Sequence, residues 1–344
     1  MVKKPLEGDN MSKPKIAVPI GDPAGIGPEI VLKSFNNKEL LNQCDIVVVG
    51  NTHVLENINN KLSLGLTINA IENPADGNYS SGVVNTIHID NIDMSKLTLG
   101  EVSGMCGKAS YDYIEKSVKL AMNKDVDGIA TTPIHKEALK AGNVDFIGHT
   151  EILGSLTSTA DPLTMFEVDK MRIFFLTRHL SLKDAVASIN KAKVMDYIER
   201  CTEALRKLGI TEGTMAVAGL NPHSGDGGLF GKEEIDEITP AIEEMQKRGF
   251  DVVGPVPADS VFYMGTQGKY SCILSLYHDQ GHIAAKTYDF HRTVALTNGM
   301  PILRTSVDHG TAFDIAGTGI ASEVSMIEAI QSCAKYAPYF TGGK

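Results

Sequence analysis

Three histidines in this chain each follow an apolar stretch that has the pattern of a β-strand. They are His179 in "RIFFLTRHLSL", His223 in "MAVAGLNPHSGDGG" and His278 in "CILSLYHDQGH". A lone histidine is more often a structural or surface residue than a ligand. In open α/β sheets, however, ligands bind outside the carboxyl ends of the strands, so these three imidazoles could converge. Three imidazoles with one open position form a catalytic zinc site and suit other divalent transition metals.

The stretch "SLYHDQGHIAAKTYDF" contains His278, Asp279, His282 and Lys286, and it could be a metal-binding pair, a catalytic loop or a turn. A His-x-x-x-His pair chelates a metal well only when both residues share one helical face. We expect Gly281 to interrupt that spacing, so His278 is the candidate ligand and His282 a neighbour. Asp279 could orient the imidazole, act as a base or simply form a turn.

Two glycine-rich segments are candidates for binding phosphate or a cofactor. "IAVPIGDPAGIGPEIVLKSF" contains Gly25 and Gly27 but lacks the third glycine and the later acidic residue of a dinucleotide-binding fingerprint. A tight turn into a helix with Pro28 at its start is the simpler interpretation. "NPHSGDGGLFGKEEI" could present backbone N–H groups to an anion. The sequence assigns no cofactor-binding residues.

Several other polar residues occupy positions where an anionic substrate could bind. His149 and Thr150 in "FIGHTEIL" are expected at a strand-to-helix junction, where Thr150 could equally cap the helix. Arg304 directly follows "PIL" and precedes a glycine-rich loop, a suitable place for bidentate binding of carboxylate or phosphate. Lys286 lies in the same C-terminal third of the chain.

The composition limits the class of protein. The 344 residues are 42% apolar, contain no membrane-spanning run, and are sufficient for two lobes with real cores. A net charge of −10 argues against nucleic-acid binding, and five scattered cysteines without C-x-x-C spacing indicate neither disulfides nor a zinc ribbon. We expect a soluble cytoplasmic protein with a flexible leader at residues 1–13.

Short apolar runs alternate with helical patterns along the chain. The expected strands are "KIAVPI", "CDIVVVG", "DGIATTP", "MRIFFLT", "TMAVAGL", "SCILSLY" and "TVALTNG". Residues 107–124 and 189–209 have apolar residues at helical spacing. This alternation predicts βα units around a largely parallel, buried sheet.

Seven motifs together resemble those of one known family. They are "GDPAGIGPEI", "TTPIHKEAL", "GHTE", "NPHSGDGG", "GPVPADSVF", "YHDQGH" and "RTSVDHGTAFDIAGTG". In this order they are similar to the 4-hydroxythreonine-4-phosphate dehydrogenases of vitamin B6 (pyridoxine) biosynthesis, the PdxA type. The resemblance covers nearly the whole chain after the leader.

The resemblance implies an α/β fold like that of isocitrate and isopropylmalate dehydrogenases, with two interleaved α/β/α lobes and no Rossmann fingerprint. We expect residues 14–142 with 300–344 in one lobe and residues 143–299 in the other. The second lobe would carry the metal site and the dimer interface, because the family is homodimeric with its active site at that interface. The expected partners are therefore a second copy and a small phosphorylated hydroxy acid, with neither nucleic acid nor membrane.

The resemblance also implies roles for individual residues. The family's metal ligands correspond to His179, His223 and His278, which would hold zinc, magnesium or cobalt. Its substrate contacts correspond to the four residues His149, Thr150, Lys286 and Arg304. Asp259 in "VPADSVF" is a further candidate active-site carboxylate, and NAD or NADP is the expected cofactor.

One family position differs in this chain. Where the vitamin-pathway enzymes have a substrate-binding Asn before "TLG", this chain reads "HRTVALTNG", with Ala295. Alanine cannot supply the hydrogen bonds of an amide. The first expectation, oxidation of 4-hydroxythreonine 4-phosphate to 3-amino-2-oxopropyl phosphate, therefore has an alternative. A sister branch converts D-threonate and D-erythronate 4-phosphates to dihydroxyacetone phosphate, and "GHIAAKTYDFHRT" looks more like that branch.

The implied mechanism combines oxidation at C3 with loss of carbon dioxide. A divalent metal would lower the pKa of the C3 hydroxyl, promote hydride transfer to NAD and stabilise the resulting enolate. Lys286 would transfer a proton or stabilise charge near C3, with Asp259 or Asp279 as its carboxylate partner. A metal-dependent hydrolase or aldolase, and a catalytically idle sugar-phosphate sensor, are the competing classes.

Overall fold

The computed structural model describes residues 12–341, which divide into two compact units. Residues 163–293 form the central unit, and residues 12–162 with 294–341 form the terminal unit. We expected the divisions after residues 142 and 299, whereas the units divide after Pro162 and Thr293. Residues 1–11 of the expected leader lie outside the described residues.

The terminal unit contains a sheet in which every neighbouring pair of strands is parallel except β11 and β12. In spatial order the strands are β3 (Thr67–Ile71), β4 (Val83–His88), β2 (Asp45–Gly50), β1 (Lys15–Pro19), β5 (Gly128–Thr131), β12 (Arg304–Val307) and β11 (Val294–Asn298). The β-branched run Ile46 to Val49 in β2 is almost completely buried, as in a strand covered on both faces.

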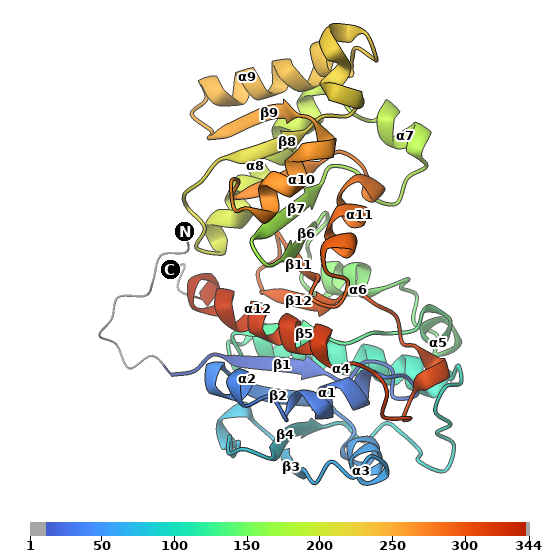
Figure 1. The fold of residues 1–344 in the computed structure, drawn as a ribbon. Coiled ribbons are helices and arrows are strands. Elements are labelled where there is room, and N and C mark those ends of the chain that lie inside the picture. The colour runs from blue at the N-terminus through green and yellow to red at the C-terminus, as the bar shows by residue number, and fades with distance from the viewer. Residues whose placement is uncertain (1–11, 342–344) are drawn as a thin grey trace. The chain divides into compact units, whose positions relative to one another are not determined.

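Helices cover both faces of this sheet (Figure 1). α4 packs against β1, β2 and β5, and α12 packs against β1, β5 and β12. The helices of the unit are α1 (Gly27–Ser34), α2 (Lys38–Gln43), α3 (Thr52–Lys61), η1 (Pro74–Asp76), α4 (Gly104–Met122), α5 (Lys136–Ala141), α6 (His149–Leu156), η4 (Phe313–Ile315) and α12 (Val324–Thr341).

The central unit has a sheet in the order β6-β7-β10-β8-β9. Its strands are β6 (Leu163–Val168), β7 (Met171–Phe175), β10 (Cys272–Ser275), β8 (Met215–Ala218) and β9 (Val252–Val256), and only the β6–β7 pair is antiparallel. Its helices are α7 (Leu182–Ala187), α8 (Lys191–Lys207), η2 (Pro222–Gly228), η3 (Glu234–Ile238), α9 (Thr239–Lys247), α10 (Ala258–Thr266) and α11 (His278–Tyr288).

The predicted α/β class with largely parallel sheets is confirmed. Each of the seven apolar runs contains a strand, and the two long amphipathic stretches became α4 and α8. The strands β3, β4, β6, β9 and β12 were not predicted. Two of these, β6 and β12, form the antiparallel pairs, which a simple βα alternation does not anticipate.

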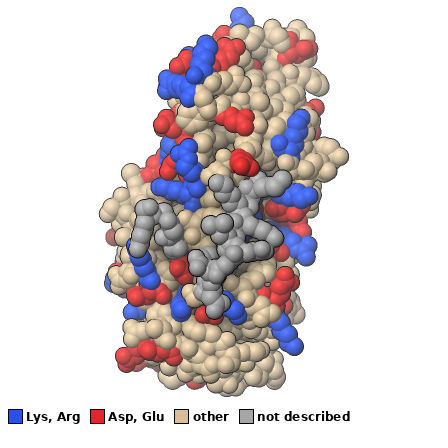
Figure 2. Space-filling view, turned by 90° about the vertical axis from the view of Figure 1, so that its left-hand side faces the viewer, with Lys and Arg blue, Asp and Glu red and all other residues tan. Residues whose placement is uncertain are grey.

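The surface carries acidic and basic side chains in mixture. On the face shown in Figure 2, Lys and Arg are interspersed with Asp and Glu. Across residues 12–341, no helix combines the length and apolar character that crossing a bilayer requires. All five cysteines are buried free thiols.

Candidate active site

The central unit brings the ends of three histidine-bearing strands to one edge of its sheet. β10 is the parallel neighbour of both β7 and β8, so the carboxyl ends of all three strands lie together. His179 follows β7, His278 follows β10 and His223 follows β8. The order along the sheet is therefore His179, His278, His223, which differs from their order in the chain. This is the edge at which open α/β sheets bind ligands.

His179 and His278 lie beside each other. Their ring centroids are 6.1 Å apart, and both residues line a cavity of about 320 Å³. His278 is the first residue of α11, and its Nδ1 lies 2.7 Å from Oδ1 of Asp279. A proton on Nδ1 donated to this carboxylate leaves Nε2 as the free lone pair, the tautomer that a metal ligand needs.

The expectation that Gly281 would interrupt the helix is wrong. α11 runs from His278 to Tyr288 without a break. Residue 281 is glycine because a Cβ there would lie only 2.6 Å from the ring of Phe175. Glycine allows the helix to approach β7 closely. His278 and His282 consequently share a helical face, with ring centroids 3.7 Å apart and ring planes 11° apart.

His282 nevertheless has structural contacts of its own. Its Nδ1 lies 2.8 Å from the backbone oxygen of His278. Its ring also packs against Phe166 and Phe175, with centroid distances of 4.4 and 4.3 Å. These contacts hold the His282 ring against β6 and β7, and its role as a neighbour of the candidate ligand His278 stays a prediction.

His223 belongs to an irregular loop. Residues 223–227 all have positive φ, from 43° at Asp226 to 84° at Gly225, and His223 itself is exposed with φ 52° and ψ 32°. Such left-handed conformations are uncommon for residues other than glycine and concentrate at functional sites.

The donor set at this edge fits a divalent transition metal. Two imidazoles on one tetrahedral zinc ion place their centroids about 5 Å apart, close to the separation of His179 and His278. Within residues 12–341, no group of three or more His, Cys, Asp or Glu side chains is arranged so that it could hold a metal ion. The histidine assignment therefore remains a prediction that the topology supports.

Lys286 and the two candidate carboxylates also lie in the central unit. Lys286 is eight residues after His278 on α11, so His278, His282 and Lys286 share one face of the helix. The Nζ of Lys286 lies 5.4 Å from the ring centroid of Phe290. Asp259 is exposed in the first turn of α10, and Asp279 is exposed beside His278.

The terminal unit contains the remaining predicted contacts around a buried arginine. Arg304 is only 5% exposed, and it donates hydrogen bonds to the hydroxyls of Thr131 (2.7 and 3.1 Å) and Thr297 (2.8 Å). Burial lowers the pKa of Arg304 to about 10, against an opposing effect of Asp308, so the guanidinium stays charged at neutral pH. A buried cation held mainly by neutral hydroxyls is suited to receive an anion.

His149 lies close enough to Arg304 for their charges to interact. Burial, with a smaller contribution from the Arg304 charge, holds the pKa of His149 well below its usual value, so its ring is neutral. Its buried Nε2 has no hydrogen-bond partner among residues 12–341. His149 and Thr150 begin α6, but a loop precedes them instead of the expected strand, and Gly148 occupies the capping position.

The register of β11 places Ala295 on the same strand face as Arg304. Thr297 pairs with Arg304 and Ala295 pairs with Ser306, and residues two apart in a strand share a face. The next residue, Thr305, donates from the opposite face to the backbone oxygen of Ala329 in α12. A carboxamide at position 295 would thus face the same side as the Arg304 guanidinium.

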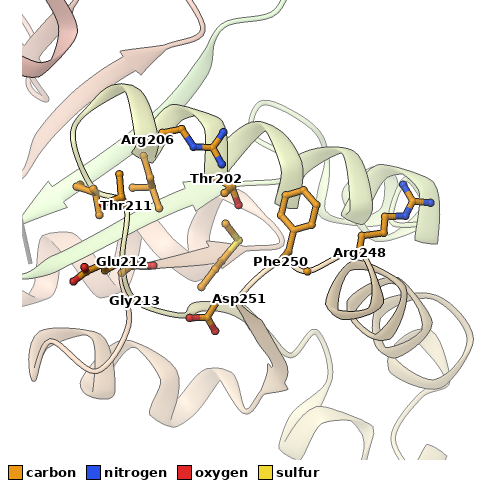
Figure 3. A pocket seen from close by; sticks show the side chains of 13 residues that line it. Thr202, Arg206, Thr211, Glu212, Gly213, Arg248, Phe250 and Asp251 are labelled. Carbon is orange, nitrogen blue, oxygen red and sulfur yellow. The ribbon is translucent and has the colours of Figure 1, made fainter. Parts of the chain in front are cut away.

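A second cavity, of about 540 Å³, lies at the opposite edge of the central sheet (Figure 3). It is lined by residues at the starts of β8, β9 and β10, and by Arg206 and Arg248, which pair with Glu203 and Glu244. The catalytic histidine candidates are absent from its lining. We therefore place the candidate active site at the carboxyl edge.

Two residues that the sequence analysis did not single out, Gln280 and Glu234, form hydrogen bonds with the segment that leads from β8 to His223; residues 219–227 are called the His223 loop below. Gln280 lies two positions after His278, within the recognised motif, and adjacency alone could have indicated it. Glu234 lies within the quoted segment "NPHSGDGGLFGKEEI", but its hydrogen bonds to Leu220 and Asn221 depend on the tertiary fold.

The chain is similar to a known family and to several named proteins. A family model described as "Pyridoxal phosphate biosynthetic protein PdxA" matches residues 42–333. A Fusobacterium nucleatum protein named "Putative D-threonate 4-phosphate dehydrogenase" is 63% identical over 326 residues, covering 95% of this chain and 98% of that protein. A protein of the same name from Halalkalibacterium halodurans is 58% identical over 328 residues, with the same coverage.

Solved structures are also similar to this chain. A 4-hydroxythreonine-4-phosphate dehydrogenase from Klebsiella pneumoniae has a TM-score of 0.87 and 38% identity, covering 94% of this chain and all of that one. A terephthalate 1,2-cis-dihydrodiol dehydrogenase from Burkholderia xenovorans has a TM-score of 0.66 and 26% identity, covering 94% and 98%. The fold, its strand-end site and these relatives define an α/β dehydrogenase. More specifically, the chain belongs to the PdxA family.

Proposed function

We propose that this protein is an NAD- or NADP-dependent dehydrogenase that oxidises and decarboxylates a 4-phosphorylated 3-hydroxy acid with the help of a divalent metal. The observation that carries this proposal is the alignment of three adjacent parallel strands, each followed by a histidine. The buried Arg304, with its neutral hydroxyl partners, supports an anionic substrate.

We propose 4-phospho-D-threonate or 4-phospho-D-erythronate as the substrate, in place of the first expectation, 4-hydroxythreonine 4-phosphate. Relatives at 63% and 58% identity carry the threonate name, whereas the Klebsiella vitamin-pathway enzyme is 38% identical. Ala295 supports the same choice, because it leaves the Arg304 face of β11 without the family's carboxamide. The product would be dihydroxyacetone phosphate.

The residues of the central unit would act on the reacting carbons. His179, His223 and His278 would hold the ion, which supplies Lewis acidity to the C3 hydroxyl and to the enolate left by decarboxylation, while the nicotinamide accepts the hydride. Asp279 would keep Nδ1 of His278 protonated, so that Nε2 faces the ion. Lys286 would stabilise charge near C3 or supply the proton that C2 takes up when the bond to C1 breaks.

The residues of the terminal unit would bind the charged ends of the substrate. Arg304 offers a permanent charge and several N–H donors, and His149 offers a neutral ring whose Nε2 has no hydrogen-bond partner in the described part of the chain. Thr150 adds a hydroxyl in the first turn of α6. Together they would orient the phosphate and carboxylate.

We further propose that the protein acts as a homodimer. Several large apolar side chains around the histidine edge are half or more exposed, which is unusual for a surface without a partner: Leu180, Leu182, Leu229, Ile235 and Ile283. They lie in the segments that follow β7, β8 and β10. A second copy of the chain, as the family resemblance implies, would cover them.

The deciding experiment measures NADH or NADPH absorbance with each candidate substrate and a divalent metal, before and after chelation. We expect chelator-sensitive reduction of the nicotinamide with D-threonate or D-erythronate 4-phosphate. Preference for 4-hydroxythreonine 4-phosphate would overturn the substrate proposal. Turnover of a phosphorylated acid without any nicotinamide would instead favour a hydrolase or aldolase.

A further inference from the structure

Glu234 is a buried carboxylate that binds the loop before His223. It is 2% exposed and lies at the start of the π-helical turn η3. Its Oε1 accepts hydrogen bonds from the backbone N–H groups of Leu220 (2.8 Å) and Asn221 (2.7 Å). Its Oε2 accepts a third, at 2.8 Å, from the side-chain Nδ2 of Asn221. Charged acceptors of this kind form the stronger hydrogen bonds in proteins.

Gln280, which comes much later in the chain, binds the same loop. Its Nε2 donates to the backbone oxygen of Gly219 at 2.7 Å, and its Oε1 accepts from the backbone N–H of Leu276 at 2.8 Å. Gly219 follows β8, and Leu276 follows β10. The 9% exposed side chain of Gln280 thus joins the exits of the two strands that lead to His223 and His278.

The contacts of Glu234 and Gln280 cover three consecutive residues, Gly219, Leu220 and Asn221, just before His223. The backbone that follows is left-handed at five successive positions, and three of these residues, His223, Ser224 and Asp226, are not glycine, so their conformation costs energy. Such a conformation persists only where its surroundings over-determine it. The two buried side chains provide that external support.

We propose that Glu234 and Gln280 are positioning residues that set the direction of His223 relative to His278. Both side chains are buried, and each would act through its hydrogen bonds to the backbone of the His223 loop. This inference rests on the proposed function, because it assumes that His223 is a metal ligand. It extends that function by naming the residues that hold the ligand in place.

Two substitutions separate the hydrogen bonds from the packing. Glu234→Gln keeps the shape of the side chain but replaces one acceptor with a donor that would face N–H groups. Gln280→Met keeps much of the volume and removes the hydrogen bonds to Gly219 and Leu276, together with a weaker one from the Ser275 hydroxyl (3.3 Å). Loss of such supporting contacts typically weakens metal binding about 10-fold to 100-fold.

The chain offers a matched control for each variant. Glu237→Gln changes a more exposed carboxylate in the same π-helical turn, whose Oε2 accepts from the backbone N–H of Lys191. Gln246→Met removes a hydrogen bond of the same kind, from Nε2 to the backbone oxygen of Val252 at 2.8 Å. Val252 begins β9, so this bond lies at the opposite edge of the sheet.

The experiment titrates metal-stripped, full-length protein with Co²⁺, records the visible absorption of the bound ion, and measures Zn²⁺ affinity by competition with a chromophoric chelator. His223→Ala is included as a reference, and thermal unfolding is recorded for every variant. We expect Glu234→Gln and Gln280→Met to lower affinity about 10-fold to 100-fold and to alter the Co²⁺ spectrum. Both controls should match the wild type.

Two results would overturn the inference, and they differ. If His223→Ala loses the metal while both Glu234→Gln and Gln280→Met bind it as the wild type does, the two residues only stabilise the fold. If His223→Ala itself binds metal normally, the ligand assignment fails and the positioning role fails with it. Should Glu234→Gln not fold, Gln280→Met alone decides the outcome.

Discussion

The Nδ1 atom of His278 lies 2.7 Å from the Oδ1 atom of its neighbour Asp279 at the start of α11. Together with the stacking of His282, the contact orients an imidazole that is 41% exposed. A carboxylate in this position determines which ring nitrogen carries the proton. Asp279, a residue type common in turns, is therefore placed to select the tautomer of the candidate ligand His278.

Replacing Asp279 with Asn should weaken metal binding about 10-fold or more and lower kcat, because a neutral amide supports the required tautomer less well. Isothermal titration with Zn²⁺ or Co²⁺ measures the affinity, and steady-state kinetics measures kcat. Asp236→Asn, at an exposed position of η3, is the control. Equal affinities in both variants would return Asp279 to the role of a turn former.

Arg304→Lys should raise KM for the phosphorylated substrate about tenfold or more. A lysine cannot bond both Thr131 and Thr297 as the guanidinium does and still present donors to an anion. Initial-rate measurements over a range of substrate concentrations test this, with the exposed Arg292→Lys as control. An unchanged KM would show that Arg304 has only a structural role.

Ala295→Asn should shift preference toward 4-hydroxythreonine 4-phosphate, because it restores a carboxamide to the Arg304 face of β11. We expect the ratio of kcat/KM for the amino acid to that for D-threonate 4-phosphate to rise about tenfold, the effect of about 1.4 kcal/mol. Ala295→Val controls for added volume. If both variants change the ratio equally, volume and not hydrogen bonding determines the selectivity.

Asp22→Asn should stabilise the protein at pH 7.5. Asp22 is fully buried, and burial raises its pKa from 3.8 to about 6, against the smaller effects of the Ala24 amide and His135. Between these values the folded state holds more protons, so the free energy of unfolding falls as pH rises through the window. Above pH 6, ionisation of Asp22 thus lowers the free energy of unfolding by about 3 kcal/mol at most.

Urea unfolding at pH 4 and pH 7.5 tests this prediction. The increase in the free energy of unfolding caused by Asp22→Asn should be small at pH 4 and approach its maximum at pH 7.5. Asp125→Asn, at an exposed site, should show no such difference between the two pH values. A variant that is equally stabilised at both pH values would show that ionisation of Asp22 is not the cause.

Leu229→Asp should favour the monomer. Leu229 is 72% exposed, and a carboxylate there would have to be desolvated in the proposed interface. Light scattering after size-exclusion chromatography measures the molar mass, with the exposed Met122→Asp in the terminal unit as control. A wild-type protein that is already monomeric at micromolar concentration would refute the homodimer itself.

The sequence alone was sufficient for the local features of this protein. Apolar runs such as Ile46 to Val49 and the helical spacing in α4 and α8 indicate their own secondary structure, because those patterns depend on residues close in the chain. The position of a histidine after a strand is likewise readable from the chain. These features led to the α/β class and to His179, His223 and His278 as candidates.

Only the tertiary structure decided which strands are neighbours. The order β7-β10-β8 places His278 between His179 and His223, and this order depends on pairing between segments far apart in the chain. The same holds for the face of Ala295, which the β11–β12 register sets, and for Glu234 and Gln280, whose partners lie 13 and 61 residues away. Gly281 shows the limit most clearly: the sequence suggested a helix break, whereas in the fold this glycine lies inside α11 and lets the helix approach Phe175.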